Sequence, residues 1–260
     1  MAALVAFALS LLAGLATGVG GVLGVLGVLG GGMSRRFLAA SLGFAAGVMA
    51  CVSILELLPQ SAADLAAAGA SPWLALLAAV LGGVAVIAFS AAARFRSRTE
   101  LPASGDARQR ALLLRTGLVT AVAITAHNFP EGFATFLTAL HDPAVALPVV
   151  AAIALHNIPE GIAVAVPIHH ATGSRGRALL ASIGSGLAEP AGALIGWLLL
   201  APLLTHVVLS AVLAGVAGIM LTICATELLP AARAQREGRA TITGLVVGAV
   251  VMAISLALLA

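Results

Sequence analysis

Charged side chains are scarce in this 260-residue chain: Asp, Glu, Lys and Arg make up 9% of it, against 61% hydrophobic residues. The mean hydropathy is +1.14. A soluble domain of this length has too little interior to bury so many apolar side chains, so the composition excludes a soluble protein. It predicts an all-α integral membrane protein with many spans.

Lysine and tyrosine are absent, and only two cysteines occur. This bias, with abundant Ala, Leu, Gly and Arg, is typical of a GC-rich bacterial genome and predicts a location in the bacterial inner membrane. Cys51 and Cys224 lie inside apolar stretches without C-x-x-C spacing, which predicts buried thiols and no structural disulfide. The start lacks a basic region and a cleavage site, so residues 2–29 are expected to be a retained helix.

Apolar stretches of about 20 residues or more predict eight transmembrane helices in one polytopic domain, residues 1–260. They lie near 2–29, 37–59, 72–93, 111–140, 143–170, 176–200, 203–230 and 241–260. The one long polar stretch, residues 94–110, is rich in arginine and is predicted to be a mobile cytoplasmic linker. The first helix has glycines every three residues from Gly18 to Gly30, which predicts close helix packing or, alternatively, a sliding surface.

All thirteen basic residues are arginines. With eight spans, every one of them falls on the same side of the membrane, which the positive-inside rule makes cytoplasmic, and both termini lie outside. The charge therefore reflects topology and does not indicate nucleic-acid binding. These arginines are Arg35, Arg36, Arg94, Arg96, Arg98, Arg108, Arg110, Arg115, Arg175, Arg177, Arg233, Arg236 and Arg239.

Helices 2 and 7 both close on the letters Glu-Leu-Leu-Pro, at Glu56 and Glu227. If helices 1–3 and 6–8 are equivalent, their offset of five helices makes the matching helices antiparallel. That pattern predicts an inverted-topology repeat around the central pair of helices 4 and 5.

One six-residue pattern, His-Asn-x-Pro-Glu-Gly, occurs twice at mid-span, at 127–132 and 156–161. A charged group there costs roughly 2.5–3.5 kcal/mol on insertion scales, so two carboxylates at this depth need a reason. In each copy the His and the Glu are four positions apart and share a helix face, with the Asn beside them. Each proline frees a backbone carbonyl, and each glycine allows close backbone approach.

Two imidazoles and two carboxylates suit Zn²⁺, with Fe²⁺, Mn²⁺, Co²⁺ or Cd²⁺ as alternatives. Helix 6 adds a third carboxylate, Glu189, at matching depth. These groups exceed the needs of one tetrahedral ion, so two adjacent ion positions are expected. The predicted metal site consists of His127, Asn128, Glu131, His156, Asn157, Glu160 and Glu189. The metal is a transported substrate; no cofactor and no catalytic residue is predicted.

The doubled hexapeptide, the two Glu-Leu-Leu-Pro endings and the Gly-Leu-Ala-Glu segment before Pro190 resemble the ZIP metal transporters, in particular their bacterial ZupT-like branch. The resemblance implies eight spans with external termini, transport toward the cytosol and a homodimer. It also implies a binuclear centre: His127, Glu131, His156 and Glu160 hold one ion. The second ion is held by Asn128, Asn157, Glu160 and Glu189, with Glu160 and also Glu131 as candidate bridges. Two departures are the lack of a His-rich 3–4 loop and Thr226 beside Glu227, where some relatives have histidine.

The leading hypothesis is uptake of a divalent metal by alternating access, with entry past Glu56 and Asp142 and exit near Glu227, His169 and His170. A passive channel that uses the same site is one alternative. The other is an enzyme, either an intramembrane metalloenzyme or a rhomboid-like protease built on Ser185 and His206. No H-E-x-x-H motif is present, and His206 falls in an external loop.

Overall fold

The computed structural model describes residues 2–31, 34–97, 105–141, 143–200 and 205–259. Every regular element in these ranges is helical, which confirms the all-α prediction. The elements are α1 (Ala2–Gly31), α2 (Arg35–Val52), η1 (Ser53–Leu57), α3 (Leu58–Ala67), α4 (Trp73–Ser97), α5 (Gly105–His141), α6 (Pro143–Thr172), α7 (Arg175–Gly186), α8 (Ala188–Ile195), η2 (Gly196–Leu200), α9 (His206–Ile223), η3 (Cys224–Leu228), α10 (Leu229–Ala234) and α11 (Gly238–Leu259).

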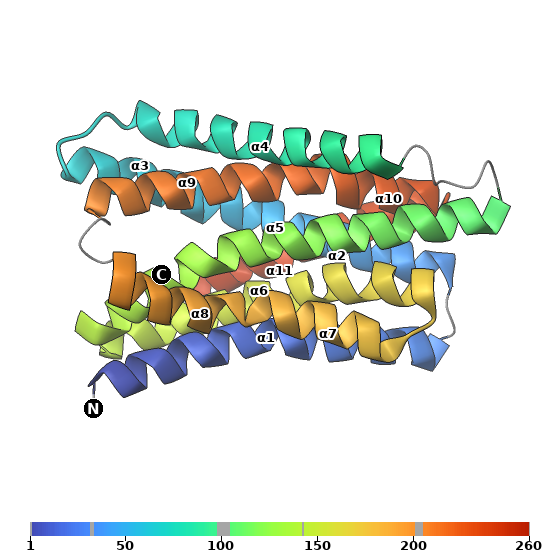
Figure 1. Cartoon of the computed structure of the whole chain (residues 1–260), viewed down its shortest axis with the longest axis horizontal. Helices are drawn as coiled ribbons and strands as arrows, with labels where there is room; N and C mark the ends of the chain where they lie inside the picture. Colours follow the sequence, from blue (N-terminus) through green and yellow to red (C-terminus); the bar gives the residue numbers. More distant parts are fainter. Residues whose placement is uncertain (1, 32–33, 98–104, 142, 201–204, 260) are drawn as a thin grey trace.

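Several short helices continue one another, so the described residues form long helical rods side by side (Figure 1). Seven described stretches are long and apolar enough to cross a membrane. They are Ala2–Gly27, Arg35–Ala67, Trp73–Ala92, Gly105–Leu137, Arg175–Leu198, His206–Ala234 and Gly238–Leu258. The 30-residue α6 is not among these seven, but it corresponds to the predicted fifth span and packs against α1 and α5 within the bundle.

The polar linker is shorter than its composition indicates. α4 continues to Ser97 and α5 begins at Gly105, so both ends of the predicted 94–110 linker are helical. Arginine is a good helix former, and polar residues can extend a helix beyond the apolar stretch that crosses the membrane. Residues 98–104 lie outside the described ranges.

Side-chain caps fix the start of three rods. Ser34 accepts a hydrogen bond from the backbone N–H of Phe37 at 3.1 Å and so begins α2. Ser174 and Thr205 accept equivalent bonds at the starts of α7 and α9. A cap of this kind satisfies one of the N–H groups that a helix leaves unpaired at its first turn.

Both Glu-Leu-Leu-Pro segments contain a π-helical turn. In η1 the N–H of Leu58 bonds to the carbonyl of Ser53, and in η3 the N–H of Leu229 bonds to the carbonyl of Cys224. In each case a proline follows at once, and because proline has no N–H the regular hydrogen-bond ladder cannot continue there. Glu56 and Glu227 therefore lie on locally widened helix turns, a feature that is frequent at functional sites.

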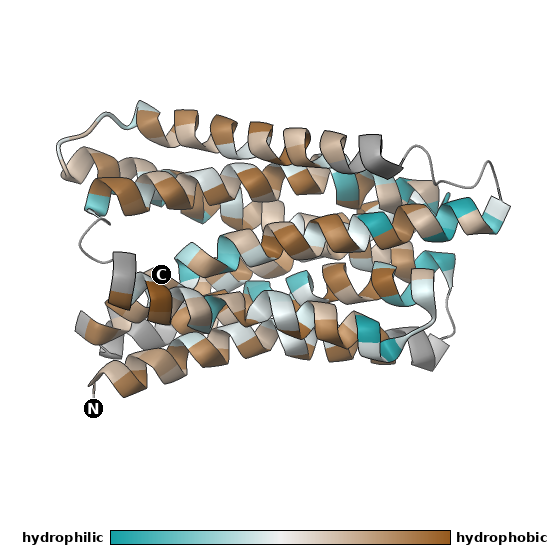
Figure 2. Ribbon diagram, in the orientation of Figure 1, coloured by the Kyte–Doolittle hydropathy of each residue, from teal (hydrophilic) through white to brown (hydrophobic). Residues whose placement is uncertain are grey.

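Packing divides the rods into two groups. The first group consists of α1, α5, α6, α7 and α8, which pack on one another. The second consists of α2, α4, α9, α10 and α11, in which α2 packs on α11 and α10 and α4 packs on α9; α2 also contacts α6 of the first group. Hydrophobic residues cover most of the ribbons, and polar residues concentrate at the ends and in the middle of the bundle (Figure 2). Large apolar side chains stay exposed on α1, α4 and α11, for example Leu12, Leu81 and Val250, as expected of a surface that faces lipid.

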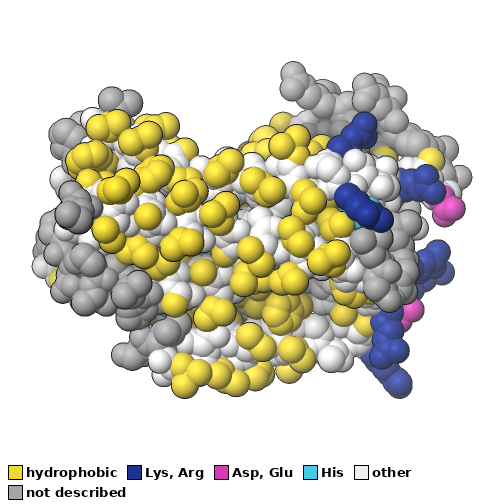
Figure 3. Space-filling view, turned by 90° about the horizontal axis from the view of Figure 1, so that it is seen from below, with side chains coloured by type: hydrophobic (Ala, Val, Ile, Leu, Met, Phe, Trp, Pro, Cys, Tyr) yellow, Lys and Arg dark blue, Asp and Glu magenta, His cyan; other side chains and the backbone are white. Residues whose placement is uncertain are grey.

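Positive charge is confined to one end of the bundle in the face that Figure 3 shows. The arginines with described side chains lie at the starts of α2, α5 and α7 and around the connection between α10 and α11. Both chain termini lie at the opposite end (Figure 1), together with Asp64 of α3 and His206 of α9. Arg94, Arg96 and Arg98 have no described side chains.

The glycines of α1 serve close packing. A methyl group at Gly21 would overlap with the side chain of Ser182, and one at Gly27 would overlap with the ring of Phe37. The same holds at Gly24, against Val166 of α6. Close approach of this kind is what small residues provide in lipid.

Candidate metal centre

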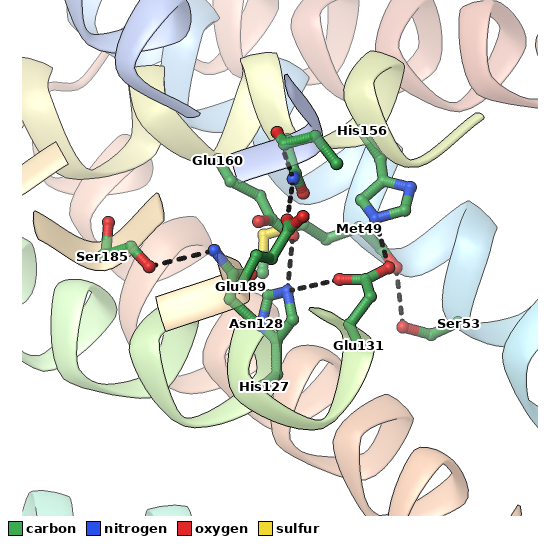
Figure 4. Close-up of polar contacts among 11 residues, drawn as sticks. Met49, Ser53, His127, Asn128, Glu131, His156, Glu160, Ser185 and Glu189 are labelled. Carbon is green, nitrogen blue, oxygen red and sulfur yellow. Dashed lines mark hydrogen bonds and ion pairs between the residues drawn. The ribbon is translucent and has the colours of Figure 1, made fainter. Parts of the chain in front are cut away.

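All seven predicted site residues are buried, and three rods supply them. Figure 4 shows His127, Asn128, Glu131, His156, Glu160 and Glu189 gathered in one place. α5 supplies His127, Asn128 and Glu131; α6 supplies the second hexapeptide; and α8 supplies Glu189. Exposed fractions range from 0% for Asn128, Asn157, Glu160 and Glu189 to 8% for Glu131. Three carboxylates at this depth are costly unless they are paired or bind a cation.

Glu131 joins the two imidazoles. Its Oε1 lies 2.9 Å from Nε2 of His156, and its Oε2 lies 3.7 Å from Nε2 of His127. The same Nε2 of His127 lies 3.2 Å from Oε1 of Glu160. Two histidines and two glutamates thus form one connected cluster, with members from both hexapeptides (Figure 4).

The two asparagines hold the cluster to its neighbours through their amide nitrogens. Asn128 Nδ2 donates to the carbonyl of Ser185 at 3.1 Å, and Asn157 Nδ2 donates to the carbonyl of Ala13 at 3.0 Å. Asn157 also donates to Oε1 of Glu189. The nitrogens are used in this way, and the two amide oxygens have no hydrogen-bond partner among the described residues.

Six buried oxygens in this centre have no hydrogen-bond donor among the described residues, and two of them, Glu131 Oε2 and Glu160 Oε1, lie within ion-pair distance of His127. The other four are Asn128 Oδ1, Asn157 Oδ1, Glu160 Oε2 and Glu189 Oε2. A buried acceptor that is left unsatisfied costs about 1–3 kcal/mol, and more if it is charged. Each of the four residues expected to hold the second ion therefore offers one oxygen that a hard or borderline cation could satisfy.

Among the described residues, no three His, Cys, Asp or Glu side chains are arranged so as to hold a metal ion as they stand. The imidazoles and carboxylates contact one another at hydrogen-bond and ion-pair distances instead. Metal ligands lie about 2.0–2.2 Å from zinc and point at a common centre. Binding would therefore exchange the His–Glu contacts for ligand bonds through small side-chain rotations.

The glycines that end the hexapeptides bring neighbouring backbones against the centre. A methyl group on Gly132 would overlap with the carbonyl of Glu189, and one on Gly161 would overlap with the carbonyl of Thr17. The predicted close approach is confirmed at both positions. α5 and α6 run on through Pro130 and Pro159 without interruption.

Glu189 reaches the centre through a break that the sequence prediction missed. The predicted helix 6 is interrupted at Leu187, which separates α7 from α8. Pro190 follows in the first turn of α8, a position where its missing N–H costs nothing. The first turn of a helix also favours a negative side chain, and Glu189 occupies it.

A cavity of about 380 Å³ leads to the centre from the end opposite the arginines, and it is called the outer cavity because that end is expected to face outside. Glu131 and His156 lie at its inner end, and Glu56, Gln60 and Asp64 line the wall that α3 and η1 form. Gln60 donates to Asp64 at 2.9 Å. Glu56 thus lies on the side where entry is expected, and Gln60 and Asp64 are lining residues that the motifs did not reveal. Asp142 lies outside the described residues.

At the arginine-rich end, Glu227 is 2% exposed and pairs with Arg115 of α5, whose Nη2 lies 3.4 Å from Glu227 Oε2. His169 is buried, and half-buried His170 lines a separate cavity with Arg35 and Asp106. The three residues expected near an exit all lie toward the arginine-rich end but do not share one cavity. Cys51 and Cys224 are free and buried, as predicted.

The chain is similar to known proteins over nearly its whole length. Residues 96–256 match the model of the ZIP zinc transporter family. The zinc transporter ZupT of Corynebacterium efficiens is 48% identical over 97% of this chain and 96% of its own length. The ZupT proteins of Streptococcus mutans and Clostridium perfringens are 45% and 41% identical, and cover 97% and 98% of this chain and 97% and 96% of their own lengths. A membrane protein with this fold, this duplicated motif and these relatives belongs to the ZIP family of transporters.

Proposed function

We propose that this protein moves Zn²⁺ across the bacterial inner membrane into the cytoplasm, through the seven-residue centre. The observation that carries the proposal is the cluster of two imidazoles and three carboxylates, all buried and all from mid-rod positions. The names of the relatives, which are zinc transporters, support the choice of metal. Fe²⁺, Mn²⁺, Co²⁺ and Cd²⁺ accept the same ligand types and are proposed as further substrates.

The proposed direction of transport rests on the resemblance to ZIP transporters, and the proposed orientation in the membrane rests on the placement of charge. The arginine-rich end is proposed to face the cytoplasm and both termini the outside, because positive residues are retained on the cytoplasmic side. The outer cavity then opens from Asp64 at the external end toward Glu131 and His156. The resemblance to ZIP transporters adds a homodimer to this proposal, with membrane lipid around the exposed apolar faces.

We further propose two adjacent ion positions. The His127, Glu131, His156 and Glu160 position is rich in imidazole and suits zinc. The position formed by Asn128, Asn157, Glu160 and Glu189 has oxygen ligands throughout, and its support is the four buried oxygens that lack a donor. Glu160 belongs to both sets and would bridge the ions.

The proposed inverted repeat is supported by matching contacts. Gly20 of α1 lies against the carbonyl of Ile158, and Gly192 of α8 lies against the carbonyl of Phe129, the same position of the other hexapeptide. Likewise α1 packs on α6 as α8 packs on α5, and α2 packs on α11 as α9 packs on α4. When the predicted helices 1–3 are exchanged with the predicted helices 6–8, and α5 with α6, the first contact in each of these comparisons becomes the second.

Under this correspondence Thr17 takes the place of Glu189. Gly161 lies against the Thr17 carbonyl as Gly132 lies against the Glu189 carbonyl. The repeat therefore supplies a carboxylate on one side and a hydroxyl on the other. This difference supports the proposal of an oxygen-only ion position beside α8.

Membership of a transporter family decides against the enzyme alternatives. The structure agrees for Ser185 and His206: the Ser185 hydroxyl donates to the Ser182 carbonyl, and His206 is exposed at the start of α9. A channel remains as the second candidate. The site favours a carrier, because the outer cavity reaches Glu131 and His156 whereas the cavity beside Arg115 and Glu227 includes none of the seven site residues.

The purified protein in zinc-free liposomes is expected to take up Zn²⁺ with a rate that saturates as the external concentration rises. Saturation follows because each transport cycle needs the centre to bind and release its ions. The degree to which added Fe²⁺, Mn²⁺, Co²⁺ or Cd²⁺ inhibits zinc uptake ranks these metals as substrates. An imposed pH gradient tests whether uptake is coupled to protons. Uptake equal to that of protein-free liposomes would refute the function, and a rate linear to high concentration would favour a channel.

A further inference from the structure

Two polar contacts connect α5 to the rod of α9, η3 and α10 at the arginine-rich end. The first is the ion pair of Arg115 and Glu227, with side chains that are 20% and 1% exposed. The second is a hydrogen bond of 3.1 Å from Gln109 Nε2 to Gln235 Oε1. Both contacts cross between the two packing groups, because α5 belongs to one group and α9 to α10 belong to the other.

The cavities on the two sides of the centre differ in whether site residues line them. The outer cavity contains Glu131 and His156 in its wall. At the arginine-rich end, a cavity of about 190 Å³ is lined by Arg115, Glu227, Gln109 and Gln235, and it includes none of the seven site residues. A second one, of about 160 Å³, lies on the other side of the Gln109–Gln235 pair and reaches Asp106 and His170.

Buried apolar side chains pack α2 and α6 against the α9–η3 junction, and two members of this cluster, Leu38 and Leu113, also line the inner cavity that reaches His170. Leu42 and Met49 of α2, Val166 of α6 and Ile223 and Cys224 of the α9–η3 junction are buried in one cluster. An ion has no ligand in such a cluster, so it cannot pass while the cluster is packed. The route is therefore open on the outer side and closed on the inner side.

We propose that the Arg115–Glu227 and Gln109–Gln235 contacts form a clamp that holds this inner side closed. The inference rests on the proposed transport function, since a clamp matters only if ions leave at this end. In the closed state the Arg115 guanidinium supplies positive charge to the buried Glu227. Opening separates α5 from η3 and α10, exposes the apolar cluster to water and leaves Glu227 available to a departing divalent ion.

The clamp makes a prediction about Cys224, which lies one turn before Glu227 and is 4% exposed. In a Cys51→Ser background Cys224 is the single thiol of the chain. The variant Arg115→Gln is expected to raise at least fivefold the rate at which a small membrane-impermeant thiol reagent labels Cys224. The reagent is applied in vesicles whose cytoplasmic face is outward, where it reaches the inner side alone.

Arg110→Gln is the matched control, because Arg110 is exposed at the same end of α5 and lines the other inner cavity. It is expected to label at the rate of the Cys51→Ser parent, and Arg115→Lys is expected to fall between. The pair Arg115→Gln with Glu227→Gln removes the clamp without a buried unpaired charge, so fast labelling of this double variant separates gating from misfolding.

Equal labelling of the parent, Arg115→Gln and the double variant would overturn the clamp. This readout requires no zinc transport, so its failure is distinct from the failure of the proposed function. Failure of zinc uptake by the parent in liposomes would refute the function, whereas the labelling rates would still decide whether the clamp exists.

Discussion

Zinc uptake by the variant Glu131→Ala is expected to fall at least about 100-fold, a loss of about 2.8 kcal/mol. Glu131 contacts both imidazoles, at 2.9 Å and 3.7 Å, and it also faces the outer cavity. Its removal takes away one ligand and the group that orients His156. Initial uptake rates in liposomes, normalised to the amount of inserted protein, measure the effect.

Glu237→Ala is the control for this change, because Glu237 is a half-buried carboxylate that lines a cavity with Arg36 and Arg239, away from the centre. It is expected to retain uptake within about twofold of the parent. Both variants are compared by size-exclusion profile, since a buried imidazole that loses its partner can destabilise the fold. Parent-like uptake by a correctly folded Glu131→Ala would remove Glu131 from the transport site.

The parent protein is expected to bind two Zn²⁺ ions per chain at saturation, and Glu189→Gln is expected to bind one with high affinity. Glu189 is fully buried and bonded to Asn157, and its Oε2 has no hydrogen-bond donor among the described residues. Loss of its charge weakens the oxygen-only position, whereas the histidine position keeps all four of its ligands. Metal analysis after equilibrium dialysis against zinc counts the ions.

Glu56→Gln serves as the comparison, since it makes the same chemical change in the outer cavity, outside both ion positions. It is expected to bind two ions. One ion per chain in the parent would contradict the second position. Two ions in Glu189→Gln with parent affinity would show that the second position uses other ligands.

Most of the metal centre could be predicted from the two hexapeptides, because the residues of each hexapeptide are close together in the chain. His127 and Glu131 are one helical turn apart, so a helix brings them together whatever else the chain does. The contact of His127 with Glu160 needed the antiparallel packing of α5 and α6, which two equal motifs at equal depth made predictable. Placement of Gly132 and Gly161 against neighbouring backbones follows from the same reasoning.

Features that depend on tertiary structure were not visible in the sequence. Leu187 has no property that marks a helix break, and the helix interruption there became evident from the backbone of α7 and α8. The sequence marks Arg115 as one more cytoplasmic charge, because nothing local links it to Glu227, far away in the chain. The pairing of Asn157 with Glu189 is similarly non-local.

The most direct test of the metal centre is the zinc X-ray absorption spectrum of the parent protein loaded with zinc. The seven-residue centre predicts nitrogen and oxygen ligands at about 2.0–2.2 Å, with imidazole scattering that weakens in His156→Ala and is unchanged in His206→Ala. His206 is the exposed histidine at the start of α9. A sulfur shell at about 2.3 Å, or a spectrum unchanged by His156→Ala, would contradict the centre.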